Sequence, residues 1–163
     1  MAPVVYTTID SPVGLLLLAG DERGLRVVRF ENSKRATPVQ PSWKQEMAPF
    51  AEVVRQLRAY FSAELKEFDL PLAPEGTEFQ LSVWRSLRTI PYGETISYGQ
   101  LAGRIGNPKA VRAVGLANGC NPIPIIIPCH RVVGSDGNLT GFGGGLPNKR
   151  KLLALESRQM SLL

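Results

Sequence analysis

The chain has 163 residues, of which 44% are apolar, and a formal net charge of +5 at pH 7. This length is enough for one domain or for two small lobes with a shared interface, and the composition is that of a soluble globular protein. The longest apolar run near the N-terminus, residues 13–19, is far too short for a membrane span, and no basic segment precedes it as in a signal peptide. We therefore expect a cytoplasmic protein with no membrane partner.

The cysteines, the histidine and the charge distribution restrict the possible metal sites, cellular compartment and binding partners. One histidine and two cysteines argue against a protein-borne zinc site, and the two thiols suit a reducing compartment better than a disulfide framework. Residues 1–75 hold nine Lys and Arg against ten Asp and Glu, whereas residues 76–163 hold ten against four. A basic half indicates a polyanion such as nucleic acid, although plain solubilising charge explains such counts more often.

The first half predicts an antiparallel sheet covered by a helix. Three strand-like runs, residues 4–9, 14–19 and 25–30, are separated by turn-forming residues. Between residues 50 and 61 the apolar side chains recur at helical spacing, which predicts an amphipathic helix on one face of the sheet. Residues 66–76 have the composition of a linker and coincide with the change in charge, so we place two lobes at residues 1–75 and 76–163.

Two capping boxes mark helix starts in the second half. Thr77 and Gln80 precede a helix that ends at Pro91, and Ser97 and Gln100 precede a short helix that ends near residues 103–106.

The helix after these has a different start. Asn107 followed by proline predicts the N-cap of a helix that runs to Gly119. Together with the preceding short helix it has the pattern of a helix-turn-helix, and its Lys109 and Arg112 suit DNA binding. Many helical hairpins bind nothing, so periodicity alone supports this interpretation only in part.

Residues 121–133 carry the strongest candidate chemistry, because Cys129 stands beside the only histidine, His130. The isoleucines before Pro128 predict a short buried strand that holds the thiol at its end. An ordinary cysteine is only a few per cent thiolate at neutral pH and needs a base. Neighbouring strand residues point to opposite faces, so His130 is expected to act through a water or a turn. An inert thiol beside a core histidine is an equal alternative.

The last thirty residues add a glycine loop and a helix. Residues 134–138 predict a hairpin turn, and the four glycines around Phe142 predict either a flexible linker or the wall of a pocket. Pro147 begins a final helix with a basic patch at residues 149–151. Glu156 lies near the end of that helix, where the dipole disfavours a carboxylate; it is either solvated or an acceptor for the histidine.

The run Pro128-Cys129-His130-Arg131-Val132, with Asn121-Pro122 and residues 141–145, resembles the signature of the alkylguanine-DNA alkyltransferases, also called methylated-DNA-protein-cysteine methyltransferases. The resemblance extends over residues 77–156 and is weaker in the first lobe. It implies an α+β fold, with a ribonuclease-H-like antiparallel sheet plus helix and a C-terminal helix-turn-helix, winged-helix-like domain that carries the active-site cysteine. It suggests no catalytic role for the first lobe.

The resemblance also implies an activity. The alkyl group on O6 of guanine, with O4-alkylthymine as a further candidate, would be transferred irreversibly to Cys129, so that each molecule acts once and needs no cofactor. The partner would be double-stranded DNA, bound by a monomer, with cooperativity on DNA left open. The damaged nucleotide would be flipped out of the duplex, since its reactive atom is inaccessible inside the stack.

Roles for single residues follow by analogy with the family. His130, oriented by Glu156, would deprotonate Cys129 through a water; Tyr98 would donate to the base; and Asn121 would organise the turn before the cysteine. The residues expected at the substrate are Tyr98, Val132, Phe142, Gly143, Gly144 and Lys149. Those expected at the DNA are Ser97, Tyr98, Asn107, Lys109, Ser135 and Arg112, the last of which would fill the vacated stack.

Departures from the family and rival interpretations complete the prediction. Phe142 stands where many members have tyrosine, no zinc ligands occur in the first lobe, and Cys120 has no family role. Small residues at 143–145 would leave room for groups larger than methyl. The rivals are a non-catalytic protein that flags alkylated DNA, a DNA-binding sensor of alkylation or redox state, and a cysteine hydrolase. Members of the first class lack the cysteine, so Cys129 argues against it.

Overall fold

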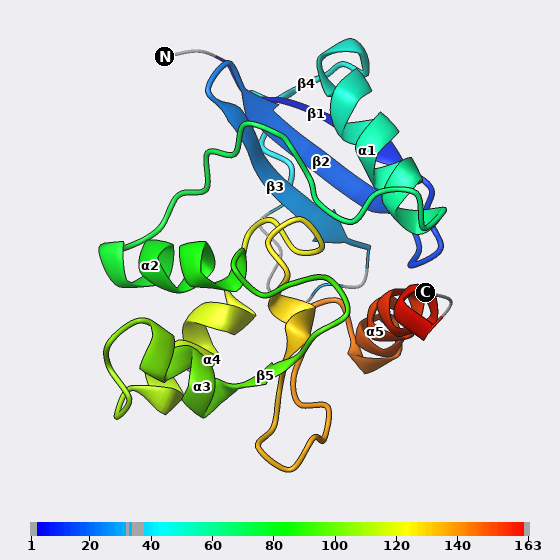
Figure 1. The fold of residues 1–163 in the computed structure, drawn as a ribbon. Coiled ribbons are helices and arrows are strands. Elements are labelled where there is room, and N and C mark those ends of the chain that lie inside the picture. Colours follow the sequence, from blue (N-terminus) through cyan, green and yellow to red (C-terminus); the bar gives the residue numbers. More distant parts are fainter. Residues whose placement is uncertain (1–2, 32, 34–37, 162–163) are drawn as a thin grey trace.

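The computed structural model describes residues 3–31, 33 and 38–161, with side chains up to Ser157. Figure 1 shows a sheet with one covering helix above a group of helices, and the last helix runs beside both parts. Among the described residues, no helix is long and apolar enough to cross a membrane.

The first lobe is built on a four-stranded sheet. Its strands are β1 (Val5–Ile9), β2 (Leu16–Asp21), β3 (Gly24–Phe30) and β4 (Lys44–Gln45), in the order β3-β2-β1-β4. The first three form the predicted antiparallel meander, and β4 pairs with β1 in parallel. Periodicity did not reveal β4, because two exposed residues are too few to show an alternation.

Helix α1 (Ala51–Phe61) follows a 3₁₀ turn, η1 (Ala48–Phe50), and lies across the sheet as predicted (Figure 1). Its buried side includes Leu57 and Tyr60, which are both completely inaccessible to solvent. The helix therefore carries a tyrosine hydroxyl into the interior, where such a group usually finds a hydrogen-bond partner.

The predicted linker runs along the outer edge of β3. The Leu25 amide donates to the Pro71 carbonyl over 2.9 Å, and the Ala73 amide donates to the Leu25 carbonyl over 2.8 Å. Further along β3, the Val28 amide donates to the carbonyl of Pro122 in the second lobe over 2.9 Å. Both segments pair with an otherwise open sheet edge and fix the two lobes against each other.

The second lobe consists mainly of helices. They are α2 (Glu78–Leu87), α3 (Tyr98–Arg104), α4 (Val111–Gly119) and α5 (Leu146–Ser161), with a short parallel pair formed by β5 (Ile96–Ser97) and β6 (Val132–Val133). Both predicted capping boxes, at Thr77 and at Ser97, are present with their reciprocal hydrogen bonds.

The start predicted for α4 was wrong. The helix begins at Val111 after Ala110, which makes no side-chain cap, and Asn107 instead opens the preceding turn by accepting from the Ala110 amide over 3.0 Å. Proline after asparagine suits the first position of a helix and the first corner of a turn equally well, because both require the same φ.

The predicted isoleucine strand was also wrong, because residues 121–128 form a buried turn. The Asn121 side chain closes it from both sides: its Oδ1 accepts from the Ile123 amide over 3.0 Å and its Nδ2 donates to the Ile127 carbonyl over 2.7 Å. Ile125 has a positive φ of 74°, which no strand permits. Cys129 consequently begins a 3₁₀ helix, η2 (Cys129–Arg131), rather than ending a strand.

Candidate active site and DNA-binding surface

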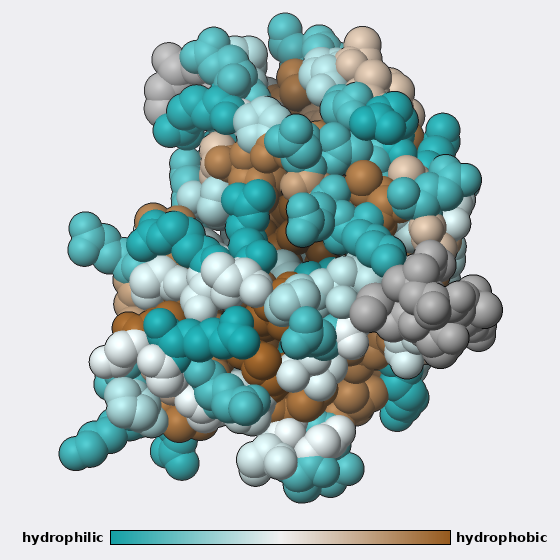
Figure 2. Space-filling model, viewed as in Figure 1, coloured by the Kyte–Doolittle hydropathy of each residue, from teal (hydrophilic) through white to brown (hydrophobic). Residues whose placement is uncertain are grey.

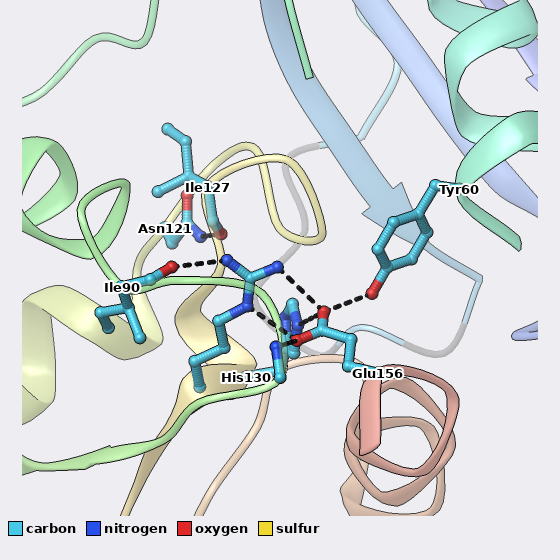
Figure 3. A network of polar contacts seen from close by, with 8 residues as sticks. Tyr60, Ile90, Asn121, Ile127, His130 and Glu156 are labelled. Atoms are coloured by element: carbon cyan, nitrogen blue, oxygen red, sulfur yellow. Dashed lines mark hydrogen bonds and ion pairs between the residues drawn. The ribbon is translucent and has the colours of Figure 1, made fainter. Parts of the chain in front are cut away.

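The Glu156 carboxylate of α5 is the centre of a buried polar network (Figure 3). Its Oε2 lies 2.7 Å from His130 Nε2, so the contact predicted between these two residues exists. Burial raises the pKa of Glu156, but the hydrogen bonds and charges of His130 and Arg131 outweigh it and bring the pKa to about 2. Because the carboxylate is ionised and cannot donate, His130 Nε2 carries the proton and Nδ1 carries the lone pair.

Arg131 belongs to this network, although we did not predict a role for it. Its Nε donates to Glu156 Oε1 over 2.8 Å, its Nη2 to Oε2 over 3.1 Å, and its Nη1 to the Ile90 carbonyl over 2.7 Å. This bidentate pairing holds the plane of the carboxylate. The sequence signal was available, since an arginine beside a buried segment needs an acceptor of opposite charge.

Tyr60 of the first lobe is a second unpredicted member. Its hydroxyl donates to Glu156 Oε2 over 2.6 Å, so the oxygen that accepts from His130 accepts from Tyr60 as well (Figure 3). The backbone amide of Gly93 reaches Oε1 over 3.3 Å. Helical spacing identified Tyr60 as a core residue but carries no information on the partner of its hydroxyl.

Cys129 lies next to this network and is 5% exposed. Burial raises the pKa of its thiol to about 11, against the opposing effects of the Asn121 side chain and the positive charge of Lys149. The resting thiol is therefore protonated at neutral pH, and nucleophilic attack requires that a base remove its proton. Burial likewise lowers the pKa of His130, so the imidazole is neutral and able to act as such a base.

Lys149 is completely buried, which corrects the prediction that it belongs to an exposed basic patch. Its Nζ donates to the Val132 carbonyl over 2.7 Å and to the Thr140 carbonyl over 3.0 Å. It thereby ties α5 to β6 and to the glycine loop. Arg150 and Lys151 remain exposed, so the basic patch is reduced to these two side chains.

The glycine loop forms a wall beside the cysteine. A cavity of about 210 Å³ is bordered by Cys129, Asn121 and residues 141–144, and Phe142 packs edge-on against Phe30 with 5.4 Å between the ring centres. Room for alkyl groups larger than methyl at residues 143–145 stays a prediction, and Gly144 has a second reason to lack a side chain. A Cβ atom there would lie 2.5 Å from the Phe30 ring, so the aromatic side chain already fills that space.

A larger groove of about 1150 Å³ adjoins this cavity along the same glycine loop. Its lining includes Tyr98 of α3, Arg112 and Leu116 of α4, and Thr140, whose hydroxyl donates to Tyr98 Oη over 2.8 Å. Leu116 is 60% exposed, and apolar side chains reach the surface over α3 and α4 in Figure 2. The groove thus combines an exposed arginine with apolar contacts on a helix pair.

The remaining predicted DNA-contacting residues do not line this groove. The Ser97 hydroxyl accepts from the Gln100 amide over 3.1 Å as the cap of α3. Asn107 and Lys109 are exposed in the turn before α4, and Ser135 is exposed in the turn after β6. Residues 134–138 do form a closed turn, but no second strand follows β6, so the predicted hairpin is absent from the described chain.

Comparisons with known proteins agree along the whole chain. Residues 4–74 match the family described as 6-O-methylguanine DNA methyltransferase, ribonuclease-like domain, and residues 78–158 match its DNA binding domain. A methylated-DNA–protein-cysteine methyltransferase of Methanosarcina acetivorans is 58% identical over 151 residues, 93% of this chain and 97% of that protein. One of Mycolicibacterium paratuberculosis is 55% identical over 155 residues, 95% of this chain and 93% of that protein.

Solved structures show the same two-lobed fold. Mycobacterium tuberculosis OGT in complex with DNA superposes with a TM-score of 0.90 at 52% identity, covering 95% of this chain and 94% of that one. The M. tuberculosis O6-methylguanine methyltransferase superposes with a TM-score of 0.89, covering 98% of both chains. The predicted ribonuclease-like lobe and helical DNA-binding lobe are therefore confirmed.

Proposed function

The chain belongs to the 6-O-methylguanine DNA methyltransferase family, and from this membership we propose that it repairs DNA by moving the alkyl group of O6-alkylguanine onto Cys129. The observation that carries the proposal is the position of Cys129. Cys129 borders a cavity beside a groove with an exposed arginine, and it is followed directly by a histidine whose buried Nδ1 has no hydrogen-bond partner among the described atoms.

The histidine tautomer specifies how the thiol loses its proton. His130 Nε2 is committed to Glu156, whereas Nδ1 is buried and has no hydrogen-bond partner among the described protein atoms. A water between Nδ1 and the thiol would pass the proton of Cys129 to the imidazole, and the ionised Glu156 would stabilise the imidazolium that forms.

Transfer then needs one bond exchange. The Cys129 thiolate attacks the alkyl carbon, the bond from that carbon to O6 breaks, and the guanine leaves as its anion, which takes up a proton. Tyr98 lines the groove, and its hydroxyl, which accepts from Thr140, is our candidate for the donor of that proton. The thioether that remains on the protein is stable, so each molecule acts once.

DNA would lie along α3 and α4. The alkylated atom is inaccessible in a duplex, so the nucleotide must be flipped out, and Arg112 on the exposed side of α4 is our candidate for the residue that fills the gap. Lys109, Asn107, Ser97 and Ser135 would contact the backbone outside the groove. In the same proposal O4-alkylthymine is a second substrate, the protein acts as a cytoplasmic monomer, and its lobes meet between residues 75 and 76.

The test is the mass of the intact protein after incubation with a duplex that contains O6-methylguanine, followed by peptide mapping. We expect one methyl group per molecule, on Cys129, and restored guanine in the DNA. Cys129→Ala should abolish transfer and leave DNA binding nearly intact, whereas the matched variant Cys120→Ala should transfer normally. Transfer by Cys129→Ala, or binding of the duplex without any gain in mass by the unmodified chain, would overturn the proposal.

A further inference from the structure

Tyr60 connects the first lobe to the proton relay of the second. It lies in the last turn of α1, is completely buried, and its hydroxyl donates to Glu156 Oε2 over 2.6 Å. The two residues are 96 positions apart in the sequence. Figure 3 shows the phenol pointing from α1 toward the carboxylate on α5.

The same carboxylate oxygen serves both Tyr60 and His130. Each additional donor to Oε2 withdraws electron density from it, which makes it a weaker acceptor for the imidazole N–H and a poorer stabiliser of an imidazolium. We propose that Tyr60 is a positioning residue of the transfer reaction, which acts through Glu156 to keep His130 uncharged and ready to accept a proton near neutral pH. This inference rests on the proposed function, in which His130 is the base.

A Tyr60 variant keeps the other charged and titratable groups around Glu156 and His130. Arg131 of η2 forms the bidentate contact with Glu156 already described, and its guanidinium lies 5.7 Å from the ring centre of Tyr92. The Lys66 ammonium lies 5.8 Å from the centre of the same ring. The Lys149 ammonium of α5 opposes protonation of His130.

The ring of Tyr60 has a separate structural role, which must be preserved in the test. It packs against Phe61 and Phe68 with 5.3 Å between ring centres in both cases, and against Tyr92 at 6.2 Å. Tyr60→Phe keeps these contacts and removes only the hydroxyl. Tyr92→Phe is the matched control, because the Tyr92 hydroxyl is also buried but has no partner among the described atoms.

The first measurement is the protonation of His130 by NMR. The chain contains a single histidine, so its ring signals need no assignment. We expect Tyr60→Phe to raise the pH of half-protonation by about one unit, as the loss of one charge-assisted hydrogen bond to the coupled carboxylate implies. Tyr92→Phe should titrate like the unmodified protein. Equal titration of Tyr60→Phe and the unmodified protein, or titration in neither, overturns the proposal.

A second variant guards against misfolding of Tyr60→Phe. Replacing Tyr60 with 3-fluorotyrosine keeps the ring and the hydroxyl but makes the phenol a stronger donor, and it should shift the titration of His130 in the opposite direction. A shift with the same sign for both replacements would assign Tyr60 to packing alone.

The second measurement is the single-turnover rate of methyl transfer between pH 5.5 and 9. Tyr60→Phe should lose up to about tenfold on the acid side, where the more basic His130 is protonated, and stay within about twofold above pH 8.5. A uniform loss at every pH with an unshifted histidine would make Tyr60 structural. If the unmodified protein transfers no methyl group, the proposed function fails, while the NMR comparison still decides whether Tyr60 controls His130.

Discussion

Glu52 on α1 and Glu156 on α5 have the same low pKa in opposite surroundings, one at the surface and one in the interior. Arg55 and Gln56 hydrogen-bond to Glu52 at the surface of the first lobe and bring its pKa to about 2. Glu156 also has a pKa of about 2, but in the interior, where burial alone would raise it. Loss of these partners should therefore cost little stability at Glu52 and much at Glu156. Water can replace the partners of the exposed carboxylate but cannot reach the buried one.

The exposed and the buried carboxylates also differ in what they connect. In exposed pairs of the first lobe, such as Arg23 with Glu75 and Arg55 with Glu52, both side chains are more than half exposed. The buried carboxylate joins both lobes through Tyr60, His130 and Arg131. The following changes should widen or abolish this contrast.

Breaking the buried pair should have the largest effect. Arg131→Met leaves Glu156 without its bidentate partner and the Ile90 carbonyl without a donor, and should lower the free energy of unfolding by about 4 kcal/mol. Arg23→Met removes an exposed partner of Glu75 and leaves Asp21 paired with Arg26, so it should cost less than about 1 kcal/mol. Urea denaturation measures both. Similar losses for the two arginines would remove the contrast.

Lowering the pH should cause the second-largest loss of stability, and it should do so through the buried site. The folded pKa of Glu156 is depressed from an ordinary 4.5 to about 2, so its contribution is present above pH 4.5 and is lost as the pH falls toward 2, about 3 kcal/mol in total. The pKa of His130 is also lowered, so the unfolded chain binds its proton first below about pH 6.5 and adds loss in the same direction. Glu156→Gln should flatten the lower window, and an unchanged slope there would contradict this account.

Two lysines on α5 give a smaller, local contrast. Lys149→Met leaves two carbonyls unpaired and should cost about 2 kcal/mol, and it should slow transfer because the charge that favours the Cys129 thiolate is gone. Lys151, exposed and 3.3 Å from the Pro12 carbonyl, should tolerate methionine within about 0.5 kcal/mol. Thermal unfolding and single-turnover rates test the pair, and indistinguishable variants would show that burial of Lys149 is inconsequential.

The smallest effect should be at Glu52. Glu52→Gln removes the charge that pairs with Arg55 but keeps the side chain in solvent, and should leave the urea midpoint unchanged despite the strongly lowered pKa. A clear drop in stability would mean that surface pairs on α1 contribute more than their exposure suggests.

The sequence predicted those parts of the fold that depend on interactions between residues close together in the chain. The capping boxes at Thr77 and Ser97, the meander and the stripe of α1 follow from interactions within a few residues, and the structure contains all of them. The isoleucine turn did not follow, because the Asn121 side chain replaces strand pairing and an apolar run has no periodicity to distinguish a buried turn from a buried strand.

The same distinction holds for the residues of the candidate site. The sequence by itself singled out Cys129 as the candidate nucleophile and His130 as its candidate base, because the run around them resembles the family signature. It also offered Glu156 as the partner of that histidine, because a carboxylate late in a helix is disfavoured by the dipole. Only the tertiary structure decided that Tyr60 and Arg131 share that carboxylate and that Lys149 is buried. These are contacts between distant segments, and a side chain's own neighbours along the chain say nothing about which buried partner it will meet.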